Sequence, residues 1–455
     1  MTEAIMNVTP KSQNKTTLVS CRIIGVLDDG INSLTAKSLN YIKQADVIIG
    51  ASRTLKLFES IFSDSVAQYD LTGKLSSVPG WIEAAQKNKQ QVIVLATGDP
   101  LCHGIAKYIS EKINFENCEI YPNVSTIQLA CARIGLSWQD LKICSVHTID
   151  TGEWLLGMDT SHGLYHLLQL TQHHNKLAIF TSPDNSPDRI ARMLLLEGFK
   201  DDFNLTVVEN ILQNNENIIG PITIAEAAKR QFSDVNIVIL QRCSTKKNYC
   251  LFGSADHLFK QRKPDKGLIT KREVRAVSLA RMQLQHNSIV WDIGAGSGSV
   301  GLEAARLCRD GHVYAIEKNS DDFSIAHQNK QDMRITNYTL VNAKAPEQLD
   351  CWPDPDAIFI GGSGGELNEL ISLCITRMHT NACLVMNFVT IENLATAVES
   401  LKKLKTELAT NCTIEWDVTQ LSAARSKPIL HMNRFQAENP VWIVTTQKEA
   451  LDDKN

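Results

Sequence analysis

The sequence lacks any run of apolar residues close to the roughly 18 needed to cross a bilayer, so no membrane span is expected. Residues 1–17 are polar and have no apolar core, which predicts a loose tail and no signal peptide. An excess of positive charge is also missing, because the formal net charge is −4. This charge excludes a strongly basic nucleic-acid-binding protein, but it leaves room for local cationic pockets that bind an acidic small molecule.

Paired cysteines are missing as well. The 12 cysteines lie singly along the chain and never form a C-x-x-C pair, which in a chain of 455 residues favours reduced thiols in the cytoplasm over disulfides or a zinc site. We expect Cys131, Cys308 and Cys374, which fall in apolar helical patterns, to be core residues. Low-complexity tracts and short repeats are absent too, which excludes a solenoid.

From Val19 onward, short apolar runs alternate with amphipathic stretches, a pattern typical of α/β folds. The length favours two domains. The candidate strands of the first half are residues 19–26, 46–49, 91–96, 119–121, 177–181, 205–208 and 236–240. Those of the second half are residues 289–293, 313–316, 339–341, 357–360, 382–388, 413–419 and 441–445, which predicts a seven-stranded sheet there.

The alternation stops between Arg242 and Lys266. We therefore predict a first domain over residues 18–245, a linker over 246–266 and a second domain over 267–448. The linker contains the charged, proline-interrupted segment 260–266, which we interpret as solvated; a basic patch for nucleic acid is the alternative. The second domain is expected to open with a capping box, because Thr270 is followed three residues later by Glu273.

The most informative motif is Asp292-Ile293-Gly294-Ala295-Gly296-Ser297-Gly298, which follows an apolar run and precedes a helical pattern. Glycines at such a turn let the backbone approach a ligand closely. Asp292 is placed to reach the amino end of a bound methionine. The next strand ends at Glu317, where a carboxylate can accept hydrogen bonds from the two hydroxyls of a ribose. The motif thus predicts a site for S-adenosylmethionine (SAM).

An NAD site is the alternative interpretation, since Gly296-x-Gly298-x-x-Gly301 also fits the dinucleotide pattern. The strict alternation of glycines at 294, 296 and 298 and the two late strands after the last helix favour SAM. After the fourth strand the chain has residues 361–365, Gly-Gly-Ser-Gly-Gly, instead of the (Asp/Asn)-Pro-Pro-aromatic tetrad of enzymes that methylate nucleic-acid amino groups. A side-chain-poor floor of this kind suits a large planar ligand and has no amide for a flipped base.

With these motifs the second half resembles the decarboxylating C-15 methyltransferase domains of cobalamin biosynthesis, a family of the class I SAM-dependent methyltransferases. The similar stretches are residues 268–275, 294–298, 345–347 and 359–365. The resemblance covers about residues 268–447 and implies a Rossmann-like domain. It also implies cofactor contacts at Thr270, Gly294, Ala295, Gly296, Ser297, Gly298, Glu317 and Ala345. Residues 342–344, Asn-Ala-Lys, depart from the family's usual Gly-x-Ala or Gly-Asp.

The first half has several short loops at the ends of its candidate strands: residues 25–30, 97–101, 122–126 and 182–187. Together with the stretch 128–140, they resemble the tetrapyrrole methylase family, especially its C-5 methylating members, over about residues 18–243. The resemblance implies two α/β subdomains with the cofactor in the cleft between them. The implied lining residues are Gly98, Asp99, Pro100, Ser125, Thr126 and Thr181. The first loop, with Gly25 and Gly30, lacks the Gly-Pro-Gly of other members.

The two resemblances in this order imply a bifunctional enzyme that uses two SAM molecules per chain. The implied reaction is methylation of a precorrin-6-type tetrapyrrole at C-5 and C-15, with loss of carbon dioxide from the ring C acetate. Two alternatives remain open: a SAM-dependent enzyme with one site that methylates another small molecule or RNA, and an NAD-dependent oxidoreductase. We expect a cytoplasmic homo-oligomer without a nucleic-acid or membrane partner.

Methyl transfer from a sulfonium to an electron-rich carbon needs alignment and exclusion of water more than an activated nucleophile. We therefore expect no catalytic triad and no metal, and we interpret His162, His166, His173 and His174 as surface or core residues. The substrate carries carboxylates, and our candidate cations for them are Arg425 and Lys427, with Arg53 in the first half.

Overall fold

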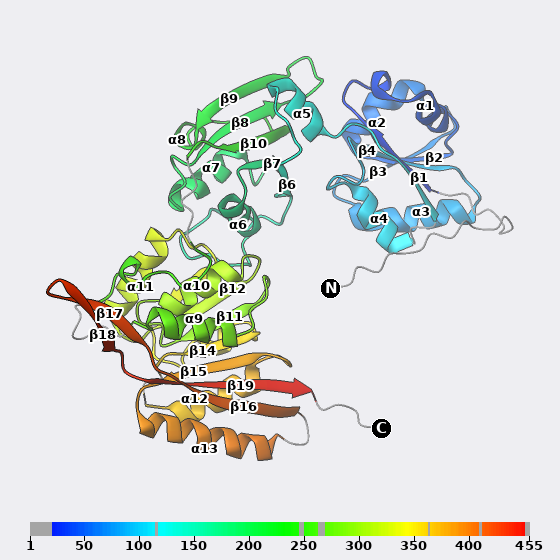
Figure 1. The fold of residues 1–455 in the computed structure, drawn as a ribbon. Coiled ribbons are helices and arrows are strands. Elements are labelled where there is room, and N and C mark those ends of the chain that lie inside the picture. Colours follow the sequence, from blue (N-terminus) through cyan, green and yellow to red (C-terminus); the bar gives the residue numbers. More distant parts are fainter. Residues whose placement is uncertain are drawn as a thin grey trace.

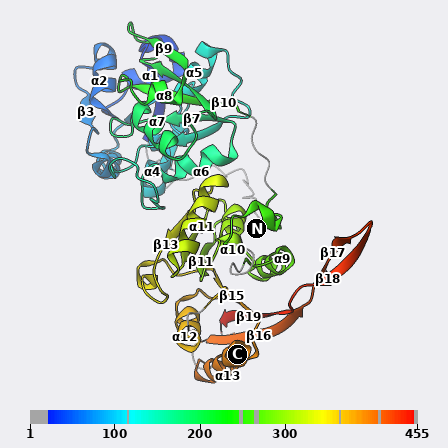
Figure 2. The same cartoon turned by 90° about the vertical axis from the view of Figure 1, so that its left-hand side faces the viewer.

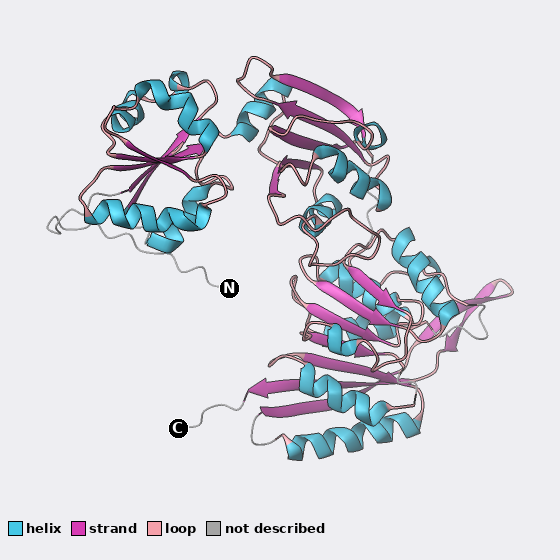
Figure 3. Cartoon of the chain, turned by 180° about the vertical axis from the view of Figure 1, so that it is seen from behind, coloured by secondary structure: helices cyan, strands magenta, loops and turns pink. Residues whose placement is uncertain are grey.

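Three helix-covered β-sheets follow one another along the chain (Figure 1). The computed structural model describes residues 21–113, 117–244, 250–262, 269–362, 365–408 and 412–450. Seen from the front and from behind, the middle sheet lies between the other two (Figures 1 and 3). The predicted α/β class is confirmed.

The first sheet is parallel, with the order β3-β2-β4-β1-β5. Its strands are β1 (Cys21–Val26), β2 (Val47–Gly50), β3 (Ala67–Asp70), β4 (Val92–Thr97) and β5 (Cys118–Tyr121). The helices α1 (Ala36–Lys43) and α2 (Ser52–Phe58) cover one face, and α3 (Val78–Lys87) and α4 (Ile105–Ile113) cover the other. Neighbouring residues of β4 enter opposite cores, which explains why this strand is a continuous apolar run.

The second sheet is mixed, with the order β6-β7-β10-β8-β9. Its strands are β6 (Lys142–Ser145), β7 (Lys176–Phe180), β8 (Phe203–Glu209), β9 (Asn217–Thr223) and β10 (Asn236–Arg242). The helix α5 (Thr126–Ile134) packs on one face, while α6 (Tyr165–His173), α7 (Pro187–Leu196) and α8 (Ile224–Ala227) pack on the other. Cys131 lies in the core under α5, as predicted.

The third sheet has seven strands in the order β13-β12-β11-β14-β15-β19-β16, and the predicted strand number is confirmed. Its strands are β11 (Ile289–Ile293), β12 (His312–Ile316), β13 (Tyr338–Val341), β14 (Ala357–Ile360), β15 (Cys383–Phe388), β16 (Cys412–Leu421) and β19 (Val441–Ala450). Strand β19 lies between β15 and β16 and runs antiparallel to both of them. An open dinucleotide-binding sheet has no such inserted strand, so this order favours the methyltransferase interpretation.

Helices cover both faces of this sheet. On one face are α9 (Arg272–Arg281) and α10 (Ser299–Leu307); on the other are α12 (Leu367–Arg377) and α13 (Ile391–Glu407). Helix α11 (Ser320–Asp332) follows β12. Cys308 and Cys374 are buried in these cores, as predicted. None of the helices within the described residues is long and apolar enough to cross a membrane.

A two-stranded hairpin, β17 (Ala424–Ile429) and β18 (Met432–Ala437), projects from the third sheet (Figure 2). The sequence pattern did not predict it. Its strands show no regular alternation of polar and apolar residues, and all of β18 is exposed.

A buried polar contact joins the second and third sheets. The hydroxyl of Tyr165 on α6 lies 2.6 Å from Nδ1 of His312, at the start of β12, and Gln169 donates to Tyr165 at 3.0 Å and to the carbonyl of Gly311 at 3.3 Å. Burial lowers the pKa of His312 to about 3. This imidazole therefore stays neutral and acts as an uncharged hydrogen-bonding bridge at the contact between the two halves.

The predicted linker, residues 246–266, contacts the second half where the structure describes it, over residues 250–262. Phe259 is only 2% exposed and packs into the core beside α9 and α10. The backbone N–H groups of Gly253 and Ser254 donate to the buried carboxylate of Glu303, at 2.8 and 2.7 Å. One carboxylate far along the sequence thus holds residues 253 and 254 on the second half, while Lys260 and Gln261 are exposed. The domain bounds stay a prediction.

Candidate cofactor and substrate sites

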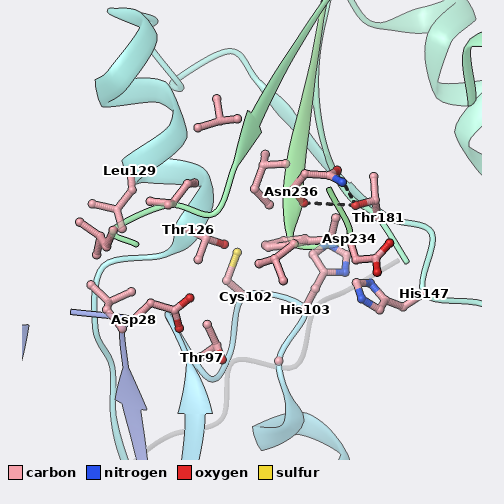
Figure 4. Close-up of a pocket in the computed structure, with 18 of the residues that line it drawn as sticks. Asp28, Thr97, Cys102, His103, Thr126, Leu129, His147, Thr181, Asp234 and Asn236 are labelled. Atoms are coloured by element: carbon pink, nitrogen blue, oxygen red, sulfur yellow. Dashed lines mark hydrogen bonds between the residues drawn. The ribbon is translucent and has the colours of Figure 1, made fainter. Parts of the chain in front are cut away.

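A cavity of about 310 Å³ opens between the first and second sheets, at the ends of their strands (Figure 4). A volume of this size falls at the lower end of the usual range for small-molecule sites. The residues that line it come from both subdomains: Leu27, Asp28, Arg53, Thr97, Cys102, His103, Gly104, Thr126, Leu129, His147, Phe180, Thr181, Val208, Ile211, Leu212, Asp234, Val235, Asn236 and Ile237.

Two of the predicted residues, Thr126 and Thr181, line this cavity. Thr126 is the first residue of α5, and the preceding Ser125 forms a capping box with Gln128. Thr181 follows β7 and donates to Oδ1 of Asn236 at 2.7 Å (Figure 4). Their positions are thus fixed by a helix start and by a neighbouring strand.

The other predicted residues of the first half are not among the lining residues but lie in the same loops as some of them. Gly98 has φ of 69°, and a Cβ there would lie 3.3 Å from the backbone nitrogen of Thr126. Asp99 accepts a hydrogen bond from the backbone of Leu101 at 2.9 Å, and the carbonyl of Pro100 accepts one from Ala106. These two residues therefore shape the turn, and a direct contact with a cofactor stays a prediction for them.

Gly25 lies where three strand ends meet. A Cβ on it would be 2.2 Å from the carbonyl oxygen of Gly98 and 2.7 Å from the backbone nitrogen of Asn123. The Asn123 side chain donates to the carbonyl of Gly25 at 3.2 Å. Backbone thus packs directly on backbone, which only glycine allows. Gly30, with φ of 68°, has no such close contact.

In the second half, the loop of residues 294–298 is tied to the end of β12. The N–H groups of Gly294 and Ala295 both donate to the carbonyl of Ile316, and Gly298 caps α10 with φ of 76°. A Cβ on Gly294 would lie 2.5 Å from the carbonyl oxygen of Gly362. The loops after β11 and β14 therefore pass each other at backbone contact, and a short helix-start turn of this kind offers N–H groups to a ligand.

Glu317 lies beside this loop, as the sequence predicted, and its side chain is buried. One carboxylate oxygen accepts from the N–H of Gly296 and the other from the N–H of Asn319, both at 2.8 Å. Each oxygen keeps a further lone pair for a ligand hydroxyl. The Asn342 amide donates to the backbone carbonyl of Glu317 at 2.7 Å, so the departure from the family pattern at 342 links the ends of β12 and β13.

The remaining predicted residues of the second half lie on neighbouring loops. The carbonyl of Thr270, ahead of α9, accepts from Arg275 at 2.7 Å, and the carbonyl of Ser297 accepts from Asn329 at 2.9 Å. Ala345 packs against the core formed with α12 and α13. Direct contacts of these residues with a cofactor stay predictions.

Asp292 is buried at the end of β11, and its contact with a bound methionine stays a prediction. Its side chain is only 1% exposed, and Oδ2 accepts from the N–H of Gly301, in α10, at 3.1 Å. Successive residues of a strand point to opposite faces, and position 292 points to the face covered by α10. Burial raises the pKa of Asp292 from 3.8 to about 7, with a smaller contribution from the charge of Glu317.

This buried carboxyl predicts a pH-dependent stability. The folded protein holds a proton on Asp292 that the unfolded chain releases. The stability that the protonated carboxyl contributes is therefore fully present below the unfolded pKa and is lost as the pH rises through the folded pKa of about 7. Asn at 292 keeps an acceptor for Gly301 and carries no charge. We expect the thermal stability of Asp292→Asn to rise relative to that of the original protein as the pH rises from about 4 to about 7, as measured by calorimetry. A constant difference across this range would contradict the assigned titration.

Comparison with known proteins supports both halves. The family described as tetrapyrrole (corrin/porphyrin) methylases matches residues 21–228, and the precorrin methyltransferase domain matches residues 263–448. A probable cobalt-precorrin-6B C(15)-methyltransferase (decarboxylating) from Pyrobaculum calidifontis is 34% identical over 43% of this chain and 96% of its own length. The chain belongs to the precorrin methyltransferases. It is thus a SAM-dependent methyltransferase, as predicted.

Two relatives span both halves. The precorrin-6Y C(5,15)-methyltransferase [decarboxylating] of Sinorhizobium sp is 27% identical over 92% of this chain and 94% of its own length. The protein of the same name from Mycobacterium tuberculosis is 24% identical over 85% of this chain and 91% of its own length. Both enzymes therefore share the order of the two domain types found here.

The predicted capping box at the start of the second methyltransferase domain is wrong. Helix α9 begins at Arg272 with Lys271 as its N-cap, and no side chain caps it. The carboxylate of Glu273 pairs instead with Arg425 at 2.5 Å. The partner comes from the β17–β18 hairpin, which no local pattern around Thr270 could reveal.

Arg425 is therefore engaged by two carboxylates, since it also lies 2.7 Å from Asp256. It lines an open cleft of about 640 Å³ together with Lys271 and Arg272. Neither Lys271 nor Arg272 has an ion pair within the described residues, so their positive charges are available to a ligand. The charge of Arg425 is instead neutralised by its two carboxylates. Lys427 is exposed on β17 and does not line the cleft. Its role in holding substrate carboxylates stays a prediction.

Sequence reasoning predicted one charged residue of the first-half cavity and missed several other polar ones. Arg53, the weaker of the predicted cations, does line it and pairs with Asp28 at 2.8 Å. Asp28 also accepts from Gln213 of the second subdomain at 2.6 Å. His103, His147 and Asp234 complete the polar lining. The only sequence signal was that most of these residues lie in loops just after or before candidate strands.

Proposed function

We propose that this chain methylates a precorrin-6-type tetrapyrrole at C-5 in its first half and at C-15 in its second half, with decarboxylation of the ring C acetate. The observation that carries the proposal is the presence of two separate glycine-walled sites in one chain. Their order is the order of the domains in relatives that are named for both methylations.

Two SAM molecules per chain are part of this proposal. SAM supplies an electrophilic methyl group when it is bound. Residues fit such a ligand at both places: the first cavity lies between two sheets at strand ends, and the loop of residues 294–298, at the start of α10, has no side chain at its three glycines to keep a ligand from its backbone. Glu317 is placed to orient a ribose, since it adjoins the loop and has lone pairs left.

The protein's own contribution to the chemistry is to position the substrate and the methyl donor. The substrate carboxylates need cations, and Arg53 in the first cavity and Lys271 and Arg272 in the second cleft are the side chains we propose for them. Loss of carbon dioxide leaves an electron pair that the conjugated macrocycle can accept. A general base or metal is not needed to activate the methyl donor. Homo-oligomer formation, the absence of a nucleic-acid partner and a cytoplasmic location stay predictions from the sequence.

The cofactor count tests the two-site part. Titration calorimetry of the intact protein with S-adenosylhomocysteine should give a stoichiometry near two. Glu317→Ala should weaken one of the two binding events, because losing a pair of hydrogen bonds to a carboxylate costs about 2–4 kcal/mol, or about 30- to 700-fold in affinity. The control is Glu347→Ala, an exposed carboxylate of the following loop. A stoichiometry of one that Glu317→Ala leaves unchanged would contradict a second site.

The reaction itself is tested by its coproducts. With the reduced tetrapyrrole as substrate, the protein should release one molecule of carbon dioxide for each two molecules of S-adenosylhomocysteine. Formation of S-adenosylhomocysteine without carbon dioxide would leave the enzyme a methyltransferase but remove the decarboxylation from its function.

A further inference from the structure

Two histidines reach the first-half cavity from opposite subdomains. His103 lies in the loop between β4 and α4, and His147 lies two residues after β6. Figure 4 shows the two rings on the same side of the cavity, with Asp234 and Thr181 at the same end. Both side chains are open to the cavity, so a bound substrate can reach them. The imidazole rings of His103 and His147 thus lie at one end of the cavity, opposite Asp28.

The position of His103 is fixed by an unusual backbone. Its φ is 53°, in the left-handed region that few residues other than glycine adopt. The next residue, Gly104, has room for no side chain, because a Cβ there would lie 2.4 Å from the carbonyl oxygen of Pro100. The His103 ring packs against Phe180, with 5.8 Å between ring centroids. A tight turn therefore holds this ring at the cavity, where strained residues are often functional.

The position of His147 is fixed by hydrogen bonds from one side. Nδ1 lies 3.2 Å from the hydroxyl of Ser145, which also accepts from the His147 backbone N–H at 3.4 Å. Within the described residues Nε2 makes no hydrogen bond. The surrounding protein, and then the charge of His103, lowers the pKa of His147. This imidazole is therefore neutral near pH 7, with one nitrogen oriented by the protein and the other available to accept a proton.

We propose that His147 is the catalytic base of the C-5 methylation and that His103 is a positioning residue beside it. The inference rests on the proposed function of the first half. Methylation forms a carbon–carbon bond at C-5 and breaks the bond from the methyl group to sulfur, leaving a neutral thioether. C-5 then carries both methyl and hydrogen. His147 Nε2 takes that hydrogen as a proton, and the electron pair of the C–H bond returns to the conjugated macrocycle.

The test compares His147→Gln with the intact protein, using tetrapyrrole that carries deuterium at C-5. We expect C-5 methylation to slow by about 10²- to 10⁴-fold in the variant, the usual contribution of a general base. Proton removal then limits the rate, so the deuterated substrate should react more slowly still in the variant, by a primary isotope effect that the intact protein lacks. C-15 methylation and the affinity for S-adenosylhomocysteine should not change.

The matched control is His166→Gln, a histidine on α6 that does not line the cavity and should leave every readout unchanged. His147→Ala is the second variant, and added imidazole should restore part of its C-5 methylation. The proposal is overturned if His147→Gln methylates C-5 at the original rate, or if its loss comes with weaker S-adenosylhomocysteine binding and no isotope effect. Absence of C-5 methylation by the intact protein would instead overturn the proposed function, and this inference with it.

Discussion

Replacing Gly296 by arginine should abolish methylation at C-15 and leave methylation at C-5 intact. Gly296 has φ of 57°, and its N–H donates to Glu317 at 2.8 Å, so a side chain there both strains the loop and fills the space next to the carboxylate. A left-handed backbone conformation costs a non-glycine residue about 1–2 kcal/mol. We expect C-15 methylation to fall by at least about 100-fold, because reacting groups that are misplaced by about 1 Å lose that much rate. Decarboxylation should fall with it if the two steps are coupled.

The measurement is the mass of the tetrapyrrole product, in which a gained methyl group and a lost carbon dioxide are separately visible. The matched control is Gly73→Arg, because Gly73 has a similar φ of 69° but nothing within 4 Å of its Cβ position. If the Gly296→Arg protein still makes doubly methylated, decarboxylated product, the division of labour between the halves is wrong.

The converse change is Gly25→Ala in the first half. The added methyl group would lie 2.2 Å from the carbonyl oxygen of Gly98, so the loop after β4 has to move away from the loops after β1 and β5. Those loops form the wall of the cavity between the first two sheets. We expect C-5 methylation to fall by about 100-fold, because reacting groups misplaced by about 1 Å lose that much, while C-15 methylation is retained.

Gly80→Ala provides the control for Gly25→Ala. Gly80 lies inside α3 with open space at its Cβ position, and alanine favours a helix over glycine. This variant should keep both methylations and gain stability. Loss of C-15 methylation in Gly25→Ala, with the second domain still folded by calorimetry, would show that the two sites are not separate.

The central strands could be predicted from the sequence because they are buried on both faces. Strand β4 is apolar up to its last residue and β11 is apolar apart from Asp292, and their predicted and observed limits agree within a residue or so. The strands that were missed have weaker patterns. Strand β3 has three exposed residues of four, and β9 contains Pro221 and is mostly exposed. Edge strands of this kind carry little apolar periodicity, so local patterning does not reveal them.

The candidate sites likewise have parts that could be predicted from the sequence and parts that could not. The glycine loop at 294–298 and the carboxylate at Glu317 lie together as predicted, because both follow neighbouring parallel strands. The burial of Asp292 could not be predicted, because the face of a strand on which a residue lies depends on register, and a single carboxylate in an apolar run does not indicate that face. His103 and His147 meet only because two separate sheets pack together. No pattern within either segment contains that information.

The central claim is that one chain carries out both methylations and the decarboxylation. It is tested most directly by giving the intact protein a precorrin-6-type tetrapyrrole and SAM labelled with deuterium in its methyl group, and then determining the product mass. The predicted product has gained two labelled methyl groups and lost one carbon dioxide. A final product with only one labelled methyl group, or with two and its full set of carboxyl groups, would contradict the account.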